Sequence, residues 1–335
     1  MESCKEGSAE APFKHIYIEE DIESSALKIT EHFPDAEIIR IKHYKDVFNR
    51  PRQSFTGQKA SPNLIIARKH GRLIYEGAPV CQDFGNKHFY YTSCVMNCLY
   101  DCEYCYLRGM YPSANPTVFI NLDDIFSELE GLLQEHPVYL CVSYDTDLMA
   151  FEDLTGYVKR WCEFTASRKD LTIEIRTKCA RTDLWDILSP CERVIFAYTV
   201  SPQEIISKYE KGTPSLKMRL NAVKSAMEHD HPVRLCFDPM IYIKGWKEVY
   251  AGMFKEVTQN IDADHIKDFS VGSFRISSGY LKNMRRMMPD SEIVNFPFEL
   301  INGYYQYPKA LEEEMEDYMS ELIRMAVPKA EIFRP

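Results

Sequence analysis

Cys98-Leu-Tyr-Asp-Cys102-Glu-Tyr-Cys105-Tyr106 is the stretch of sequence that decides the fold. It places three cysteines in a Cys-x3-Cys-x2-Cys spacing. An ordinary carrier of a four-iron cluster holds that cluster with four Cys thiolates. Three thiolates would leave one iron without a protein ligand, and that iron could bind a second molecule. The spacing therefore predicts a cluster that takes part in chemistry.

Two other interpretations of these cysteines stay open at the level of sequence. They could form a zinc site with Cys94 as a fourth ligand, or they could be packed core thiols. Zinc sites usually pair two Cys-x2–4-Cys knuckles or recruit His, and the nearest His is His88, outside the run. Cys94 could also replace one cluster ligand in a slipped register.

The three-cysteine run resembles the signature of the radical S-adenosylmethionine (SAM) superfamily. The resemblance implies a 4Fe–4S cluster held by Cys98, Cys102 and Cys105, with the amino and carboxylate groups of SAM on the open iron. Electron transfer into the sulfonium then releases a 5′-deoxyadenosyl radical, while the protein supplies position and exclusion of water. The resemblance also implies an electron donor such as flavodoxin or ferredoxin.

Composition predicts a cytoplasmic enzyme. The chain has 335 residues, of which 45% are hydrophobic and 27% are charged, so it can bury a substantial core. Its 11 cysteines are an odd number, and no apolar leader precedes them, which argues against secretion and a disulfide framework. No apolar run reaches the roughly 18 residues of a membrane span. The net charge of −10 means that any DNA site must be a local patch.

Hydrophobic periodicity predicts a small α/β unit over residues 1–85 and alternating strands and helices from residue 86 onward. Strand–helix alternation implies parallel βαβ units, compatible with an open partial barrel whose ligands sit at the carboxyl ends of the strands. The expected strands after the cysteine run are residues 117–120, 138–144, 171–176, 193–199 and 233–239. The expected helices are residues 122–134, 151–167, 182–188, 216–228 and 248–259, with a final helix over 311–325.

We therefore expect the α/β class, with the partial (β/α)6-type barrel that the resemblance to the radical SAM superfamily implies. We expect residues 1–85 to form an N-terminal α/β extension, residues 86–265 the barrel, and residues 266–335 a C-terminal α+β extension that contacts substrate or DNA. We also expect a monomer.

Further motifs resemble those of the spore photoproduct lyase family. They are Tyr90-Tyr91-Thr92-Ser93-Cys94-Val95-Met96-Asn97-Cys98, Tyr104-Cys105-Tyr106-Leu107, Asn121-Leu-Asp-Asp-Ile125, Asp153-Leu-Thr155, Thr177-Lys178, Glu210-x-Gly212-Thr213 and Gly245-Trp246. The resemblance implies reversal of the 5-thyminyl-5,6-dihydrothymine lesion of DNA to two thymines, using SAM and a reduced cluster. The deoxyadenosyl radical would take hydrogen from C6 of the dihydrothymine half, and a thiol would return hydrogen to the product radical.

Two tyrosines flank the last cysteine of the run. Tyr104 occupies the position where superfamily members place an aromatic residue near the SAM adenine, and Tyr106 is close enough to pass a hydrogen atom to or from a radical. Both could instead be packing residues, although a buried Tyr still needs a hydrogen-bond partner.

Polar residues at successive strand ends predict a shared ligand site. Thr146 and Asp147 follow the strand that ends at Tyr144, while Lys178 and Ser201 follow the next two strands. The resemblance implies that Thr146, Lys178 and Ser201 contact SAM, with Lys178 pairing with its carboxylate. Helix caps and a solvated lysine are the alternatives.

DNA contact is predicted near the C-terminus. Arg275 follows an expected strand, Arg285 and Arg286 are adjacent cations, and Tyr304 and Tyr305 follow an Asn-Gly pair, which is a strong hairpin signal. An aromatic hairpin tip could help to extrude a lesion from the base stack. A solvated charged face and a packed hairpin are the alternatives.

The chain departs from the family at the hydrogen donor. Many members carry a Cys three residues before the Asp that aligns with Asp147, but here that position is Tyr144. Cys141 lies three residues earlier and would point to the opposite strand face. We therefore predict Cys81, in a loop entering the cysteine-rich region, as the donor, with Cys141, Tyr144 and Tyr106 as alternatives.

Two alternatives to the lesion-reversing lyase remain. One is a radical SAM enzyme of the same architecture that acts on another nucleic-acid lesion or substrate. The other is a non-catalytic zinc or iron–sulfur binding protein.

Overall fold

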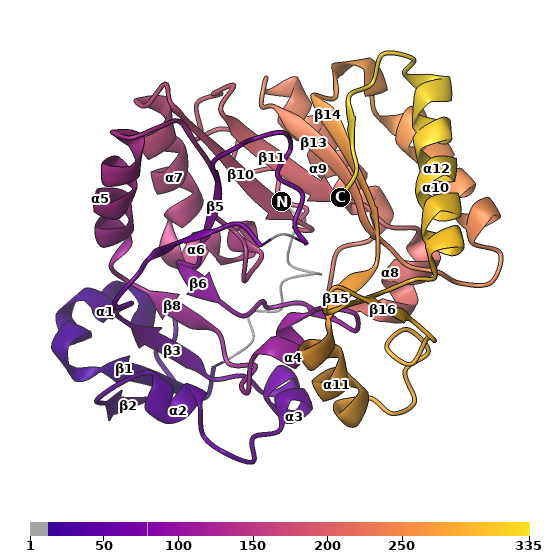
Figure 1. The fold of residues 1–335 in the computed structure, drawn as a ribbon. Helices are drawn as coiled ribbons and strands as arrows, with labels where there is room; N and C mark the ends of the chain where they lie inside the picture. The colour runs from indigo at the N-terminus through magenta and orange to yellow at the C-terminus, as the bar shows by residue number, and fades with distance from the viewer. Residues whose placement is uncertain (1–12, 79) are drawn as a thin grey trace.

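Two β-sheets, each mostly parallel, form the framework of the protein (Figure 1). The structure, a computed structural model, describes residues 13–78 and 80–335. In order across the larger sheet, its strands are β18 (Ile332–Phe333), β14 (Asp268–Ser273), β13 (Val233–Met240), β11 (Val194–Thr199), β10 (Leu171–Thr177), β9 (Val138–Cys141), β5 (Phe89–Thr92) and β4 (Ile74–Glu76). All neighbours in this sheet pair in parallel except β4 and β5.

Helices connect the parallel strands and cover the outside of the curved sheet, where α5, α7, α10 and α12 stand in Figure 1. The helices after β8 are α5 (Leu122–Leu133), α6 (Glu152–Thr155), α7 (Tyr157–Ala166), α8 (Gln203–Tyr209), α9 (Leu216–Glu228), α10 (Trp246–Asn260), α11 (Ser278–Met287) and α12 (Lys309–Ala326). Because strands β5, β9, β10, β11, β13 and β14 run parallel and in this order across the sheet, they form the predicted open partial (β/α)6-type barrel.

The smaller sheet corrects one expectation. Its order is β2 (Glu37–Ile41), β1 (His15–Glu19), β3 (Leu64–Ala67), β8 (Thr117–Phe119) and β6 (Val95–Met96). Residues 117–120 were expected in the barrel, but β8 pairs in parallel with β3, with Val118 opposite Ile66. The short buried run of β8 suits either sheet, so its pairing is decided by tertiary contacts. Both sheets take strands from either side of residue 85, and the domain boundaries stay a prediction.

Two expected helices are wrong in detail. Residues 151–167 form α6 and α7 instead of one helix, because Gly156 has φ +64° and ends α6 in the left-handed conformation. Residues 182–188 form turns, although Leu184, Trp185 and Leu188 are buried. The smaller helices before β8 are α1 (Glu23–Thr30), α2 (Lys45–Phe48), α3 (Phe55–Ala60) and α4 (Leu107–Met110).

Two small antiparallel sheets complete the fold. β7 (Asp101–Cys102) pairs with β12 (Glu210–Lys211). β15 (Arg275–Ser277) and β16 (Glu299–Ile301) both pair with β17 (Tyr304–Gln306). Asn302 and Gly303 have φ of +50° and +86°, so the Asn-Gly pair makes the predicted hairpin turn between β16 and β17. Among the described residues, no helix combines the length and apolar character needed to cross a bilayer.

Candidate active site

A large cavity lies at the carboxyl ends of the parallel strands, where an open barrel is expected to bind ligands. It encloses about 490 Å³. The strand-end residues that line it are Tyr91 on β5, Ser143 and Tyr144 after β9, Arg176 and Thr177 on β10, Thr199 on β11, Asp238 on β13 and Phe274 after β14. The predicted residues Cys81, Cys98, Tyr104, Cys105, Tyr106, Thr146, Asp147, Lys178, Arg275 and Tyr304 also line it, together with Cys102.

The three cysteines of the motif share one wall of this cavity, which the fold builds from a short strand and a loop. Cys102 is fixed by the pairing of β7 with β12, and the Arg108 guanidinium donates to its carbonyl at 3.2 Å. The Lys59 ammonium donates to the carbonyls of Cys98 and Tyr100, at 2.5 and 2.7 Å. The loop is therefore held by its backbone, which leaves the thiols to face the cavity.

Cys94 is separated from these three thiols. It is fully buried, its Sγ lies 3.9 Å from the Val142 carbonyl oxygen, and it does not line the cavity. Within the described part of the chain, no three His, Cys, Asp or Glu side chains are placed to hold a metal ion. In a four-iron cluster each ligand binds a different iron, so the thiols do not have to converge on one metal ion. Three thiols along one wall therefore fit a cluster with three protein ligands better than a zinc site completed by Cys94.

Tyr104 lies beside the cysteines, and its phenol is held by hydrogen bonding to a buried carboxylate. Its phenol donates to the buried carboxylate of Glu210, which also accepts from the Arg219 guanidinium. The Ser201 hydroxyl donates to the same carboxylate at 2.7 Å and is 3% exposed. Although burial alone would raise the pKa of Glu210, the Arg219 charge holds it at about 2. Ser201 is not among the residues that line the cavity, and its hydroxyl supports Tyr104 through Glu210, while its contact with SAM stays a prediction.

Lys178 is placed by Asp147. One Asp147 oxygen accepts the backbone N–H of Lys178 at 2.6 Å, and the other accepts the Thr177 hydroxyl at 2.7 Å. The Lys178 ammonium lies 5.7 Å from the centre of the Tyr104 ring. Thr146 instead donates its hydroxyl to the Asn97 carbonyl at 2.8 Å, which ties the strand-end loop to the cysteine loop. Lys178 thus supplies a cation on this cavity wall. Asp147 holds the backbone of Lys178, and Thr146 holds the backbone of Asn97.

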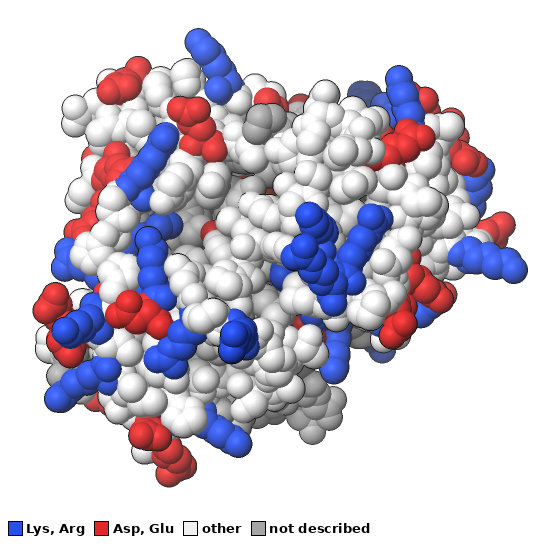
Figure 2. All heavy atoms as spheres, turned by 60° about the horizontal axis from the view of Figure 1, so that its bottom comes forward, with Lys and Arg blue, Asp and Glu red and all other residues white. Residues whose placement is uncertain are grey.

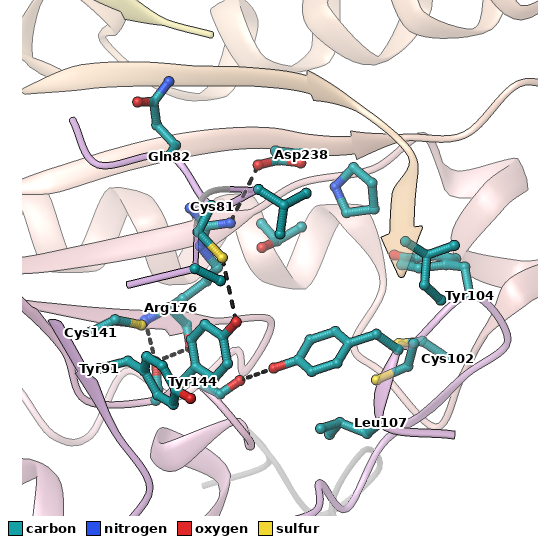
Figure 3. Close-up of a pocket in the computed structure, with 18 of the residues that line it drawn as sticks. Cys81, Gln82, Tyr91, Cys102, Tyr104, Leu107, Cys141, Tyr144, Arg176 and Asp238 are labelled. Carbon is teal, nitrogen blue, oxygen red and sulfur yellow. Dashed lines mark hydrogen bonds and ion pairs between the residues drawn. The ribbon is translucent and has the colours of Figure 1, made fainter. Parts of the chain in front are cut away.

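Figure 3 shows a cluster of Cys81 and tyrosines on the opposite side of the cavity. The Cys81 sulfur lies 3.5 Å from the Tyr144 phenol oxygen, and the rings of Tyr144 and Tyr91 stack at 4.0 Å. The Tyr106 phenol donates to the Tyr144 carbonyl at 2.5 Å, so it bridges the two sides. Burial raises the pKa of the Cys81 thiol more than the Tyr144 hydrogen bond lowers it, which keeps the S–H bond intact at neutral pH.

Cys141 also lines the cavity, but it lies within β9 and is 7% exposed. Burial raises the pKa of Cys141 as well. A strand backbone fixes Cys141, whereas Cys81 enters the cavity from the segment between β4 and β5. The structure therefore brings the predicted donor Cys81 and the predicted Tyr144 into direct contact.

Arg275 lies in an internal ion pair at the edge of the cavity. Its guanidinium forms a two-pronged ion pair with Asp238 at 2.9 and 3.2 Å, and its Nε donates to the Val80 carbonyl at 3.0 Å. The Arg275 side chain is 14% exposed. These partners occupy the Arg275 guanidinium inside the protein, where Arg275 lines the cavity, and its contact with DNA stays a prediction.

Tyr304 and Tyr305 lie on opposite sides of the β17 strand. Tyr304 lines the main cavity, whereas Tyr305 lines a second, shallow hollow of about 360 Å³ with Lys282, Arg285 and Arg286. Figure 2 shows a depression near the centre of one face of the protein, and Lys and Arg side chains surround this depression. The aromatic residues are not at the hairpin tip, which consists of Asn302 and Gly303.

Sequence reasoning missed Arg176, Asp238, Glu210 and Arg219. Arg176 and Asp238 stand near the ends of β10 and β13, so the strand-end rule that selected Lys178 could have found them. Glu210 was noted as part of a motif without a role. Arg219 lies within α9, where no local signal distinguishes a buried cation from a solvated one.

Comparison with known proteins finds related sequences and structures. The sequence model of the spore photoproduct lyase family matches residues 89–333. The chain is 24% identical to spore photoproduct lyase of Geobacillus sp. (strain Y412MC61) over 179 residues, or 52% of each chain. It is 21% identical to spore photoproduct lyase of Bacillus subtilis (strain 168) over 249 residues, or 70% of this chain and 72% of the relative. The first of these matches spans about half the length of the relative.

Solved structures of spore photoproduct lyase share the fold. A mutant with dinucleoside spore photoproduct superimposes with a TM-score of 0.83 at 19% identity, covering 97% of this chain and 100% of the other. A mutant with bound AdoMet and dinucleoside spore photoproduct gives a TM-score of 0.82 at 19% identity, with 96% and 98% covered.

Proposed function

Because the chain belongs to the spore photoproduct lyase family, we propose that it repairs DNA by reversing the spore photoproduct, 5-thyminyl-5,6-dihydrothymine, to two thymines. The observation that supports this activity best is the sharing of one cavity by three unpaired thiols and a separate thiol–phenol pair. The first set suits a cluster that starts radical chemistry, and the second suits a hydrogen donor that ends it. The repair reaction needs the cluster and the hydrogen donor within reach of the same substrate.

A 4Fe–4S cluster and SAM fit the donor set. When bound, the two supply the one-electron chemistry that removes a hydrogen atom from an unactivated carbon. Cys98, Cys102 and Cys105 would hold the cluster, Lys178 would pair with the SAM carboxylate, and Tyr104 would pack against the adenine. A flavodoxin or ferredoxin would deliver the electron.

The residues across the cavity would then govern the product. Cys81 gives the hydrogen atom of its S–H bond to the product radical, which leaves the unpaired electron on sulfur. Tyr144 would return a hydrogen atom to that sulfur, since its phenol oxygen lies 3.5 Å away. The phenoxyl radical left on Tyr144 would then take one electron from the external reductant and one proton. Tyr106, whose phenol donates to the Tyr144 carbonyl, lies between Tyr144 and the three cysteines.

The test of the function is an anaerobic incubation of the reconstituted protein with SAM, dithionite and DNA that contains the dithymine lesion. Repair to two thymines is the expected result. Cleavage of SAM with an untouched lesion would instead favour a different substrate for the same architecture. About four iron and four sulfide per chain are expected, and stoichiometric zinc after strictly anaerobic purification would contradict both enzyme readings.

Lys178→Ala should weaken SAM binding without loss of iron. A hydrogen bond to a charged group contributes about 1.5–3 kcal/mol, which corresponds to a Kd roughly 10- to 150-fold higher. Calorimetric titration of SAM into the reconstituted variant measures this change. Lys224→Ala is the control, because Lys224 is exposed on α9 and pairs with Glu228 at 3.8 Å. Unaltered SAM affinity in Lys178→Ala would make Lys178 an ordinary surface lysine.

The second hollow suits the DNA backbone. Lys282 and Arg286 are exposed there, while Arg285 is fixed by donating to the carbonyls of Val294 and Phe296 at 2.7 and 3.0 Å. β17 and α11 line both the second hollow and the main cavity. A DNA phosphate bound in the second hollow would therefore leave a flipped base free to enter the main cavity. We place backbone contact here, in a chain whose net charge is negative.

The double variant Lys282→Gln/Arg286→Gln should bind a lesion-containing duplex more weakly. Each lost phosphate contact should also reduce the slope of log K against log salt by about 0.9. Repair of a dinucleotide lesion, which lacks flanking DNA, should stay at the wild-type rate. Lys217→Gln/Lys224→Gln on α9 removes the same charge and is the control. Equal duplex affinity in the two double variants would contradict a phosphate site in this hollow.

A further inference from the structure

Arg275 joins two parts of the chain that are far apart in sequence. Arg275 begins β15, Asp238 lies in β13, and Val80 belongs to the segment that leads from β4 to β5. The guanidinium contacts both carboxylate oxygens of Asp238 and, through Nε, the Val80 carbonyl. All three nitrogens of the guanidinium are therefore in use, and one of them holds the residue next to Cys81.

From this geometry we infer that Arg275, Asp238 and Gly272 form a clamp that positions the Cys81 thiol in the cavity. Arg275 and Asp238 are positioning residues that act through the backbone of Val80. The importance of the clamp for the reaction rests on the proposed role of Cys81 as the hydrogen donor.

The ion pair is built to stay charged although it is buried. Asp238 is 7% exposed, and a second cation, Arg176, lies 3.6 Å from it. Burial alone would raise the pKa of Asp238, but Arg275 and Arg176 together lower it. Arg176 also contacts Glu174 at 3.2 Å, so the two arginines face two carboxylates. A balanced set of this kind fixes the Arg275 guanidinium in one orientation.

The segment that carries Cys81 has one other strong anchor. The Phe84 ring packs 3.4 Å from the Arg234 guanidinium, at the far side of Cys81 from Val80. Arg234 is itself held by Asp268 and Glu174. Cys81 lies between the two anchors, so loss of the Val80 anchor should release its end of the segment while Phe84 stays in place.

Gly272 explains why the Arg275 side chain can lie where it does. A Cβ at Gly272 would stand 2.9 Å from Arg275 Nη1 and 3.1 Å from the Asp238 carboxylate. Real Cβ atoms do not approach so closely, and the far end of a flexible arginine is the group that moves at least cost. Substitution at Gly272 should therefore displace the guanidinium without removing any charge.

The experiment uses Gly272→Ala and Arg275→Gln in the reconstituted full chain. Site-resolved mass spectrometry measures the rate at which iodoacetamide alkylates Cys81 in the absence of SAM. We expect Cys81 to react at least severalfold faster in both variants, because the released segment exposes the thiol. Gly131→Ala and Gly252→Ala are matched controls in helices, where an added Cβ meets nothing within 4 Å, and these should react at the wild-type rate.

Iron content and thermal unfolding show whether each variant is folded. Arg275→Gln leaves Asp238 with less compensation and can be destabilised, whereas Gly272→Ala keeps every charge. Wild-type alkylation rates in a folded Gly272→Ala variant would overturn the clamp. The product of lesion repair is a separate readout: with dithionite, a larger share should be trapped as the sulfinate adduct. Faster alkylation with an unchanged product would support the clamp and refute Cys81 as the donor.

Discussion

Replacing Cys98, Cys102 or Cys105 singly with Ala should abolish stable incorporation of the 4Fe–4S cluster and, with it, SAM cleavage. Each of the three thiols faces the same cavity, and within residues 13–78 and 80–335 no further thiol lies on that wall. A cluster that already has only three protein ligands cannot lose another and remain attached. The expected result is iron below one atom per chain after reconstitution, loss of the broad absorbance near 400 nm, and no detectable 5′-deoxyadenosine, all of which follow from thiolate ligation.

Cys94→Ala is the matched control for this prediction. Cys94 lies four residues from Cys98, but it is fully buried and its sulfur faces the Val142 carbonyl. Its replacement should cost about 1 kcal/mol of stability, as for other small changes in a packed core, while iron content and SAM cleavage persist. Loss of the cluster in Cys94→Ala together with its retention in Cys98→Ala would show that the ligands are in a different register.

The sequence was sufficient for the features that depend on local pattern. Short β-branched runs such as Leu171–Thr177 and Val194–Thr199 have the composition of buried parallel strands, and both form in the larger sheet. The cysteine spacing is equally local, and the three thiols do reach one cavity. The Asn302-Gly303 turn was predictable because few residue pairs accept positive φ twice.

Features that depend on distant partners were not predictable. β8 has the same composition as a barrel strand, and only its pairing with β3 places it in the other sheet. α11 contains Gly279 and Asn283, which weaken the helical pattern, so its formation depends on packing against α4. The internal ion pair of Arg275 has no local signal, because Asp238 and Val80 are 37 and 195 residues away in the sequence.

Ser201 shows the same limit at the cavity wall. Its position after β11 suggested a ligand contact, but its hydroxyl donates to Glu210 at 2.7 Å and Ser201 is not among the residues that line the cavity. The strand-end rule locates the mouth of the barrel, and it does not tell which polar groups are consumed by neighbours. The same rule also selected Thr146 and Lys178, and both of these do line the cavity.

Cys81→Ala should divert the reaction rather than stop it. The variant is expected to cleave SAM and consume lesion, because the cysteine wall is unchanged, but the product radical then lacks its hydrogen donor. With dithionite as reductant, a sulfinate adduct should become the main product in place of two thymines. Liquid chromatography with mass detection separates the two, and Cys162→Ala, a buried cysteine of α7 outside the cavity, is the control.

Isotope labelling gives this prediction a second and independent readout. A thiol exchanges its hydrogen with solvent, so wild-type repair in D2O should place deuterium in the methyl group of one thymine, and Cys81→Ala should greatly reduce the yield of that labelled thymine. The hydrogen of the Tyr144 phenol also exchanges with solvent, but a phenol is a less favourable hydrogen donor to an allylic radical than a thiol. The Tyr144 phenol oxygen lies 3.5 Å from the Cys81 sulfur. Tyr144→Phe should therefore retain labelled thymine in the first turnover and slow later ones, because Cys81 must recover its hydrogen. If Cys81→Ala repairs the lesion as cleanly as the wild type, the donor lies elsewhere on the same wall, and Cys141→Ala becomes the variant that decides it.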